Sequence, residues 1–536
     1  MTRDTQIPKT RYPGSKPFTR DDEQLFFGRD EDISKLTTFI QVERTTVLYG
    51  KSGLGKTSLL NAGALPRLES EHQYYVIPVR FGSYTQGNLK HPLDIAEEQI
   101  ARNDSRKNFL SEIESEDISL WQHIKSLEHA LSDSTLPNQI TFLLVFDQFE
   151  ELFTYPEGIA DFAEALADLL YSRVPKSFQR ALRLATRNNS DLLTPEQLEF
   201  LERPANLKVL MSIRSDRMSL LDSLSSHIPS ILLNCYELKP LSRAQAEDAI
   251  TSPAGKAGEF QSPPFTYQPE ALEKILDYLT GKNAKPIESF QLQILCHYVE
   301  ESLVIAKGDT CVEKDDLGDL ETIYQNYYND SIKKVGTAEE QLKARIFIEE
   351  GLIFEKEKRR ITLYEGQIQS TFDVSPELLR RLADTHIIRS EPHSSGGYMY
   401  EVSHDTLVAP ILKAKARRYQ SQQEEKIQQH LMEIKRQRKK KINRAIAFLV
   451  ALVVSYLLII IAISIHFDMK IKDLPGLIVI AFVVFLLALQ FLEIPATIAL
   501  IYEFITGESF LSKLRRRAKD PTRQKGIFTK LGRWLS

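Results

Sequence analysis

Over its first half the chain alternates between short, uninterrupted apolar runs and longer amphipathic stretches. Phe142–Phe146 is one such run, and Ile159–Tyr171 is one such stretch. Uninterrupted runs of this length are typical of strands buried on both faces of a parallel sheet, whereas apolar residues at 3.6 spacing predict helices. The alternation predicts an α/β domain over residues 25–252. Its expected strands are Thr46–Tyr49, Tyr75–Phe81, Thr141–Phe146, Lys208–Ile213 and Ile231–Tyr236.

A polar leader (residues 1–24) precedes this domain, and the pattern turns helical beyond it. Residues 253–355 predict a helical domain, with helices at Ala271–Leu279, Phe290–Ala306, Glu321–Lys334 and Glu339–Phe354. Residues 356–412 change again. They predict a short strand at Ile361–Leu363, a helix at Pro376–Thr385, and a hairpin of Ile387–Ser390 with Tyr398–Val402 around Ser-Ser-Gly-Gly. Helices closed by a hairpin predict a winged-helix-like domain.

The last quarter of the chain is basic and apolar. Residues 413–444 predict a basic juxtamembrane helix, and Ala445–Ile465 follows with 21 residues and no formal charge. About 20 apolar residues span a bilayer, so 445–465 predicts a transmembrane helix, and 476–502 predicts a second one. Residues 503–536 form a basic tail. Basic flanks stay in the cytoplasm, so we expect a multi-pass hairpin in the inner membrane of a bacterium, with both termini and the body cytoplasmic.

Charge is distributed unevenly behind a formal net charge of −4. Residues 431–536 carry 18 Lys/Arg and 7 Asp/Glu, a net charge of +11, and the remaining residues carry 50 and 65, a net charge of −15. An acidic body disfavours nucleic acid as a partner, while the basic tail favours the anionic lipids of the cytoplasmic leaflet. Three dispersed cysteines exclude a disulfide framework and a zinc site, and they suit a reducing compartment.

The segment Gly50-Lys51-Ser52-Gly53-Leu54-Gly55-Lys56-Thr57 matches the phosphate-loop pattern G-x-x-x-x-G-K-[ST] between an expected strand and an expected helix. Glycines let backbone N–H groups surround phosphates, a lysine reaches the β and γ oxygens, and a threonine hydroxyl binds Mg²⁺. The loop predicts ATP or ADP with Mg²⁺ as cofactor. Its candidate binding residues are Gly50, Ser52, Gly53, Gly55, Lys56, Thr57 and Ser58.

An acidic group follows the expected strand Thr141–Phe146. Asp147 would reach the carboxyl edge of the sheet beside the phosphate loop, so Thr57 and Asp147 are the candidate metal ligands. Hydrolysis also needs a group that orients water. Glu150 or Glu151 could act as the general base, or Gln148 could position the water, and the residues leave this choice open. We expect an ATP hydrolase with slow turnover.

Short motifs in this order resemble the STAND NTPases, specifically the bacterial "novel STAND" group, over residues 11–412. They are Arg11–Phe18, Phe26–Asp30, the phosphate loop, Asp147–Phe153, Ser212–Asp216, Pro240–Ser242, Ser252–Ala254 and Val402–Asp405. The resemblance implies an α/β P-loop NTPase with a parallel sheet, AAA+/STAND-like, at 25–252. A helical lid and a winged-helix domain would follow, and the two transmembrane helices come last. It also implies several site residues: Phe27, Gly28 and Arg29 against the adenine, Arg214 at the γ-phosphate, Pro253 in the lid, and His404 at the ADP phosphates.

Each implied role has a structural alternative. Arg214 stands next to Asp216 and Arg217, which is also typical of a surface ion-pair cluster. Arg29 precedes an acidic helix start, where a salt bridge is equally natural. His404 could simply cap a strand end.

Together these features favour a membrane-anchored signalling switch that is closed with ADP and that opens and forms homo-oligomers with ATP. A bacterial defence or stress role fits the family, and the trigger is unknown. Two alternatives stay open: a winged-helix DNA-binding ATPase, and a membrane-anchored scaffold with little turnover. The hairpin stretch Glu391–Glu401 contains no Lys or Arg, which disfavours the first. Intact Lys56, Thr57 and Asp147 disfavour the second.

Overall fold

A computed structural model describes residues 9–466 apart from short internal gaps, together with Gly476 and Ile478. The chain divides into two units, Met1–Gln420 and Ser421–Ser536, which are described separately. The gaps are residues 73, 83–89, 103–109, 111–112, 114–118, 133–139, 189–192, 282–285 and 393–396.

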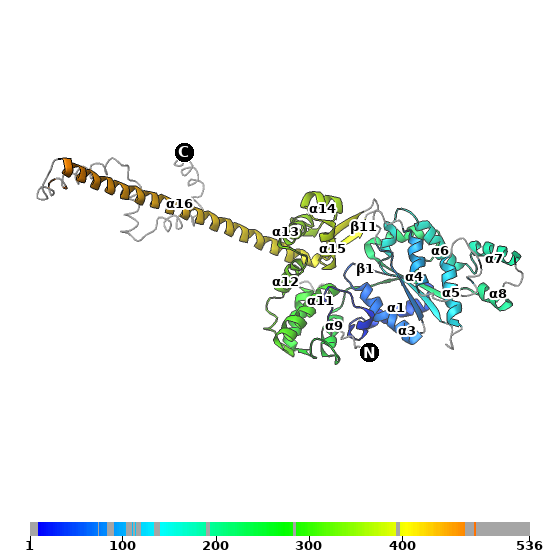
Figure 1. Cartoon of the computed structure of the whole chain (residues 1–536). Helices are drawn as coiled ribbons and strands as arrows, with labels where there is room; N and C mark the ends of the chain where they lie inside the picture. Colours follow the sequence, from blue (N-terminus) through cyan, green and yellow to red (C-terminus); the bar gives the residue numbers. More distant parts are fainter. Residues whose placement is uncertain are drawn as a thin grey trace, which may run out of the picture. The chain divides into compact units, whose positions relative to one another are not determined.

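The first unit is built on a five-stranded parallel sheet of order β2-β3-β4-β1-β5 (Figure 1). The strands are β1 (Thr45–Gly50), β2 (Tyr74–Val79), β3 (Thr141–Phe146), β4 (Leu207–Arg214) and β5 (Cys235–Glu237). Four expected strands lie where the apolar runs place them. The fifth is shorter than expected because residues 231–234 form turns, in which Leu233 is exposed.

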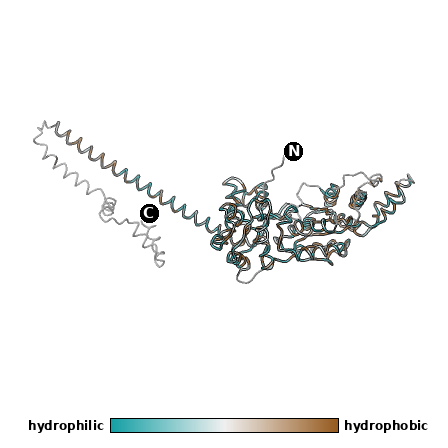
Figure 2. Tube along the Cα trace, turned by 90° about the horizontal axis from the view of Figure 1, so that it is seen from below, coloured by the Kyte–Doolittle hydropathy of each residue, from teal (hydrophilic) through white to brown (hydrophobic). Residues whose placement is uncertain are grey.

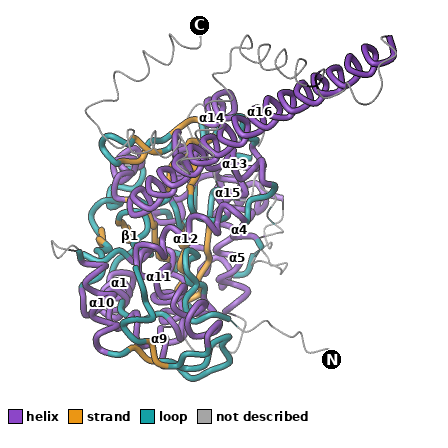
Figure 3. The backbone as a smooth tube through the Cα atoms, turned by 90° about the vertical axis from the view of Figure 1, so that its left-hand side faces the viewer, coloured by secondary structure: helices purple, strands orange, loops and turns teal. Residues whose placement is uncertain are grey.

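Apolar side chains fill both faces of the sheet, as uninterrupted apolar strands require. In β3, Phe142, Leu144 and Phe146 join the core on one face, and Leu143 and Val145 join the core on the other. Figure 3 shows the strands between helices. The first core includes helices α4 (Pro92–Ala101), α5 (Leu120–Ser132), α6 (Ile159–Tyr171), α7 (Lys176–Asn188) and α8 (Pro195–Glu202). The second includes α1 (Asp30–Val42), η2 (Leu59–Ala64) and α3 (Leu65–His72).

A helical region follows the sheet. It contains α9 (Arg243–Gly255), α10 (Pro269–Thr280), α11 (Ser289–Val299), η6 (Glu300–Ile305), α12 (Leu320–Lys333), and the small strand pair β6 (Thr266–Tyr267) and β7 (Cys311–Val312). The leader belongs to this region, because Tyr12 is fully buried in its core. Arg11 is also fully buried and donates to the carbonyl oxygens of Pro253 and Lys256. Within the described part of the expected leader, residues 9–24, Arg11 and Tyr12 are therefore part of the packing, and η1 (Arg20–Leu25) begins there.

The remainder of the first unit shares a third core, which extends from Tyr328 to Ala414. Its elements are α13 (Ala338–Ile346), η7 (Phe347–Gly351), β8 (Ile353–Phe354), β9 (Arg359–Arg360), β10 (Leu363–Tyr364), α14 (Glu365–Phe372), α15 (Pro376–Asp384), β11 (Ile388–Pro392), β12 (Tyr398–Val402) and η8 (Asp405–Leu407). As expected, β11 and β12 form an antiparallel hairpin, and β10 extends it into a three-stranded sheet.

Two boundaries in this region differ from the expectation. The helix expected over Glu339–Phe354 ends at Gly351, and Ile353–Phe354 pairs with Arg359–Arg360 instead. The strand expected at Ile361–Leu363 falls mostly between β9 and β10, because Ile361 and Thr362 are in no strand and only Leu363 belongs to β10. Apolar periodicity does not locate such short pairings, because two-residue strands have too few positions to show alternation.

Helix α16 (Val408–His466) contains the first expected transmembrane segment, 445–465. Figure 2 shows brown, hydrophobic turns along its distal part. Within the described residues, one helix is long and apolar enough to cross a membrane, and this helix is α16. Its apolar stretch is not buried. The second expected span (476–502), apart from Gly476 and Ile478, and the basic tail (503–536) lie outside the described residues.

Gly28 offers a test of how the sheet and the helical region pack. Its φ is +78°, and an added Cβ would lie 2.2 Å from the carbonyl oxygen of Gln245 in α9. We expect Gly28→Ala to lower the free energy of unfolding of the full-length chain by roughly 2–4 kcal/mol, since overpacking adds to backbone strain. Gly308→Ala is the matched control, because its φ is +82° with open space around it. Equal losses in thermal or denaturant unfolding would show that the contact with α9 is unimportant.

Candidate nucleotide site

The phosphate loop follows β1 and leads into a short helix, α2 (Lys56–Ser58), which continues as η2. Gly53 and Gly55 have φ values of +82° and +89°, a region that side chains disfavour, so the loop's glycines fit its turn. Lys56 Nζ donates to the carbonyl oxygen of Gly50 at 2.8 Å. Burial lowers the pKa of Lys56. This half-buried ammonium on the phosphate loop is a candidate site for a polyphosphate.

Asp147 reaches the phosphate loop from β3, although β4 lies between β3 and β1. Thr57 Oγ1 donates to Asp147 Oδ2 at 2.8 Å. Asp147 Oδ1 is buried and accepts no hydrogen bond from any described residue. A hydroxyl and a carboxylate oxygen are donors that Mg²⁺ prefers, and the second oxygen is available for a cation, so these residues fit the expected metal.

An aromatic cluster fixes the segment that follows Asp147. The rings of Phe146 and Phe149 lie 5.5 Å apart, and both contact Phe81 and Phe162. Between the two anchored rings the chain turns sharply, with Gln148 in the left-handed region at φ 56°. Packing of this kind holds the acidic turn in one position.

The three candidates for orienting water have different surroundings. Glu151 already has partners, because its carboxylate accepts a hydrogen bond from the Gly82 backbone N–H at 2.9 Å and forms an ion pair with Arg80 at 3.3 Å. Gln148 also accepts from Arg80. Glu150 Oε2 is buried without a hydrogen-bond partner among the described groups, and burial raises the pKa of Glu150. Buried carboxyl groups with raised pKa values are typical of functional sites.

Residues Phe27, Gly28 and Arg29 lie where the sheet meets the helical region. Phe27 and Arg29 line a cavity of about 1280 Å³ that also includes the phosphate loop. Arg29 is buried and tied to protein groups: it donates to Asp32 Oδ2 and the Lys239 carbonyl oxygen at 2.8 Å, and burial lowers its pKa. The salt bridge at the helix start, which was the structural alternative for Arg29, is therefore present. Gly28 packs against α9, and the carbonyl oxygen of Pro253 accepts a hydrogen bond from Arg11.

Arg214 ends β4 and faces the same cavity. It forms a bidentate pair with Asp216, at 3.0 Å from Nε and 2.7 Å from Nη2, and Arg217 lies 3.9 Å from that carboxylate. The expected ion-pair cluster is therefore present, and Arg214, Asp216 and Arg217 all line the cavity. The place of Arg214 at the γ-phosphate stays a prediction.

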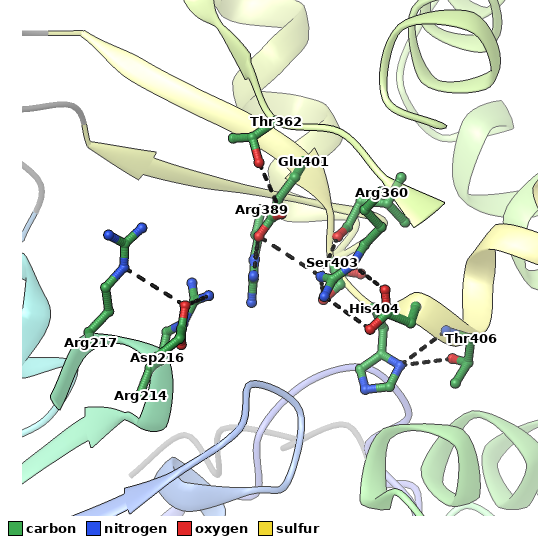
Figure 4. Close-up of polar contacts among 12 residues, drawn as sticks. Arg214, Asp216, Arg217, Arg360, Thr362, Arg389, Glu401, Ser403, His404 and Thr406 are labelled. Atoms are coloured by element: carbon green, nitrogen blue, oxygen red, sulfur yellow. Dashed lines mark hydrogen bonds and ion pairs between the residues drawn. The ribbon is translucent and has the colours of Figure 1, made fainter. Parts of the chain in front are cut away.

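His404 lies directly against the phosphate loop (Figure 4). A Cβ on Gly53 would be 2.7 Å from His404 Cδ2, so only glycine leaves room for the imidazole. The ring stacks on Phe290 at 5.2 Å, its Nδ1 accepts from the Thr406 backbone at 3.3 Å, and its Nε2 is 3.2 Å from Glu288. Burial and nearby arginines lower the pKa of His404 to about 4, so the ring is neutral at pH 7 and Nε2 carries its proton.

A family model described as Novel STAND NTPase 1 matches residues 12–444. The chain belongs to this family. Its fold is an α/β P-loop NTPase with a parallel sheet and helical regions, as the motifs predicted. A comparison with curated protein sequences gives no match.

Among solved structures this STAND NTPase is similar to the Aeropyrum pernix ORC2 protein in its ADPNP–ADP complexes, with 14% identity, coverage of 77% of this chain and 97% of that one, and a TM-score of 0.38. A. pernix ORC1 in complex with DNA has 16% identity, coverage of 74% and 96%, and a TM-score of 0.35. Cdc6p from Pyrobaculum aerophilum has 12% identity, coverage of 72% and 94%, and a TM-score of 0.33.

The structure adds cavity residues that sequence reasoning missed. Lys16 from the leader, Arg80 after β2, Arg360 of β9 and Arg389 of β11 all line the cavity. The Arg11–Phe18 motif was a signal for Lys16, although it suggested no role. The three arginines carry no local signal, since only the tertiary fold brings them to the phosphate loop.

Glu150 allows a pH test of this STAND NTPase. A carboxyl group whose pKa is raised by folding costs stability progressively as the pH rises above its unfolded-state pKa. The cost is complete above the raised pKa of the folded chain, because the buried charge is then unfavourable. We expect Glu150→Gln to raise the free energy of unfolding by roughly 1 kcal/mol at pH 8, and the gain to vanish as the pH falls to about 4. Unfolding curves of the full-length chain measure this difference. Glu202→Gln, at an exposed position of α8, should change nothing at either pH; a pH-independent effect at Glu150 would contradict the account.

Proposed function

We propose that this STAND NTPase is a slow ATP hydrolase that acts as a nucleotide-dependent switch. Lys56 and the loop backbone from Gly50 to Ser58 bind the phosphates, Thr57 and Asp147 hold Mg²⁺, and Glu150 orients the attacking water. Phe27 and Arg29 lie on the adenine side, while Gly28 and Pro253 shape the wall behind them. Mg²⁺ would supply charge neutralisation at the phosphates. Glu150 is preferred over Glu151 and Gln148 because these two already bond to Arg80 and Gly82.

The observation that carries the switch is the contact of His404 with Gly53. It joins the end of the C-terminal sheet to the phosphate loop, where a bound nucleotide would lie close to both. ADP would leave this closed arrangement intact, and ATP would compete with it. A ligand shifts such an equilibrium only by binding one state more tightly, so a contact at the phosphates suits this task. The region of the contact, residues 356–412, is proposed to act as a winged-helix module.

We also propose that the open form assembles into homo-oligomers at a membrane. Ile427, Leu431 and Ile434 are exposed on α16 at spacings of four and three residues, a pattern typical of a helix seam between copies. The uncharged segment 445–465 supports an anchor, and the hairpin with 476–502 remains a prediction. A role in defence and the existence of a trigger enter this proposal only as expectations from the family.

Lys56→Ala tests the nucleotide site. Removing the ammonium should weaken ATP binding by on the order of a hundredfold, because a charge-assisted contact to the phosphates is lost. Isothermal titration of the full-length chain with Mg-ATP measures the affinity. Lys51→Ala, on the same loop but exposed, is the control and should bind like the unmodified chain. Equal affinities for all three proteins would place the nucleotide elsewhere.

His404→Ala tests the switch. Without the imidazole against the phosphate loop, the closed form should be less favoured, so ADP should dissociate about tenfold faster and particle size in ADP should increase. Stopped-flow release of a fluorescent ADP and light scattering provide the two readouts. His72→Ala, at an exposed site on α3, is the control. If ADP release and particle size match the unmodified chain, His404 does not hold the closed form.

A further inference from the structure

The cavity wall contributed by the C-terminal part of the first unit is rich in arginine. Arg360 of β9 and Arg389 of β11 line the cavity together with Arg214 at the end of β4 and Arg217 in the following η5 (Ser215–Leu224). Over the whole lining, eight Lys/Arg side chains stand against five Asp/Glu side chains, an excess of three positive charges. The body of the chain has the opposite sign overall. A positively charged cavity wall in an otherwise acidic part of the chain favours the binding of an anion.

Arg389 has a defined position in this wall. It lies opposite Glu401 in the register of the β11–β12 hairpin and forms an ion pair with that carboxylate. Glu401 also accepts from Thr362 Oγ1 at 3.2 Å and lies 3.9 Å from Arg360. The side chains of Arg389 and Glu401 are 17% and 12% exposed, so both are held in place rather than solvated. In Figure 4 the guanidinium of Arg389 points away from the hairpin, into the space between Arg214 and His404.

The two arginines on opposite walls affect each other electrostatically. Burial and the positive charge of Arg214 lower the pKa of Arg389 to about 10, although Glu401 opposes this shift. Arg214 itself is paired with Asp216. Two guanidinium groups from distant parts of the chain are therefore brought close at the edge of the phosphate loop, where like charges repel. An anion between them would remove this repulsion and could accept from both.

We propose that Arg389 is a specificity-determining residue of the nucleotide site: it contacts the terminal phosphate of a nucleoside triphosphate and so distinguishes it from a diphosphate. The inference rests on the proposed function, since it needs the phosphates at Lys56. A guanidinium has five N–H donors in a planar fork, so a carboxylate partner on one edge does not exhaust its capacity. The terminal phosphate accepts from another edge of the guanidinium and, as a second anion on the same cation, weakens the ion pair between Arg389 and Glu401. Weakening this ion pair between β11 and β12 links the triphosphate to opening.

The test compares affinities of the full-length chain for Mg-ADP and for a non-hydrolysable Mg-ATP analogue. Arg389→Gln should weaken binding of the analogue by roughly ten- to hundredfold, the size of one charge-assisted hydrogen bond, and leave ADP affinity within about twofold. Arg389→Lys keeps the charge without the planar fork and should lie between. Glu401→Gln removes the competing carboxylate and should shift the preference the other way, toward the analogue. Arg359→Gln, exposed on β9 next to Glu357, is the matched control.

The outcomes separate this inference from the proposed function. Equal losses for ADP and the analogue in Arg389→Gln, or no loss for either, would overturn the role of Arg389 while Lys56→Ala still weakens nucleotide binding. Unchanged affinity in Lys56→Ala would instead remove the nucleotide site itself. If Arg389→Gln does not fold, as judged by its thermal unfolding, the ratio measured for Arg389→Lys decides. An analogue-to-ADP ratio in Arg389→Lys equal to that of the unmodified chain contradicts the proposal.

Discussion

His404 lies so close to Gly53 that any side chain at residue 53 would collide with the imidazole. This contact joins elements about 350 residues apart, because Gly53 belongs to the phosphate loop after β1 and His404 follows β12. The ring is held by Phe290, Thr406 and Glu288, and its surroundings keep it neutral. The contact places the end of the C-terminal sheet against the phosphate loop. It also links this loop to the part of the chain that leads into α16.

A second constraint fixes the other side of the cavity. Glu300 is fully buried and accepts from the backbone N–H groups of Arg11 at 2.8 and 2.9 Å and of Tyr12 at 3.1 Å, and from Ser262 Oγ at 2.6 Å. A buried carboxylate is costly unless its oxygens are satisfied, and here the leader supplies the donors. The leader is thereby held where Lys16 lines the cavity, so the site has walls from three separate parts of the chain.

Much of the fold and part of the site follow from sequence pattern alone. The run Phe142–Phe146 predicts a doubly covered strand, and the strand places Asp147 at the sheet edge, where Thr57 contacts it. Local patterns suffice here because the loop and the strand end carry their own chemistry. The end of the helix at Gly351 and the short strand β5 were misplaced, since tertiary pairing rather than periodicity sets them. Arg80 and Arg389 could not be predicted as cavity residues, because no motif near them in the sequence is typical of phosphate binding. His404 came only from the family resemblance.

The most direct measurement of the central claim is the distance between the phosphate-loop side and the C-terminal sheet in each nucleotide state. Spin labels at Ser223→Cys in η5 (Ser215–Leu224) and Lys356→Cys, between β8 and β9, would sit on exposed positions of the two parts, with Cys235 and Cys311 replaced. Pulsed electron spin resonance should give one narrow distance distribution with ADP. The account predicts a longer, broader distribution with a non-hydrolysable ATP analogue, and the same broadening for His404→Ala with ADP. A single unchanged distribution in all three samples would contradict it.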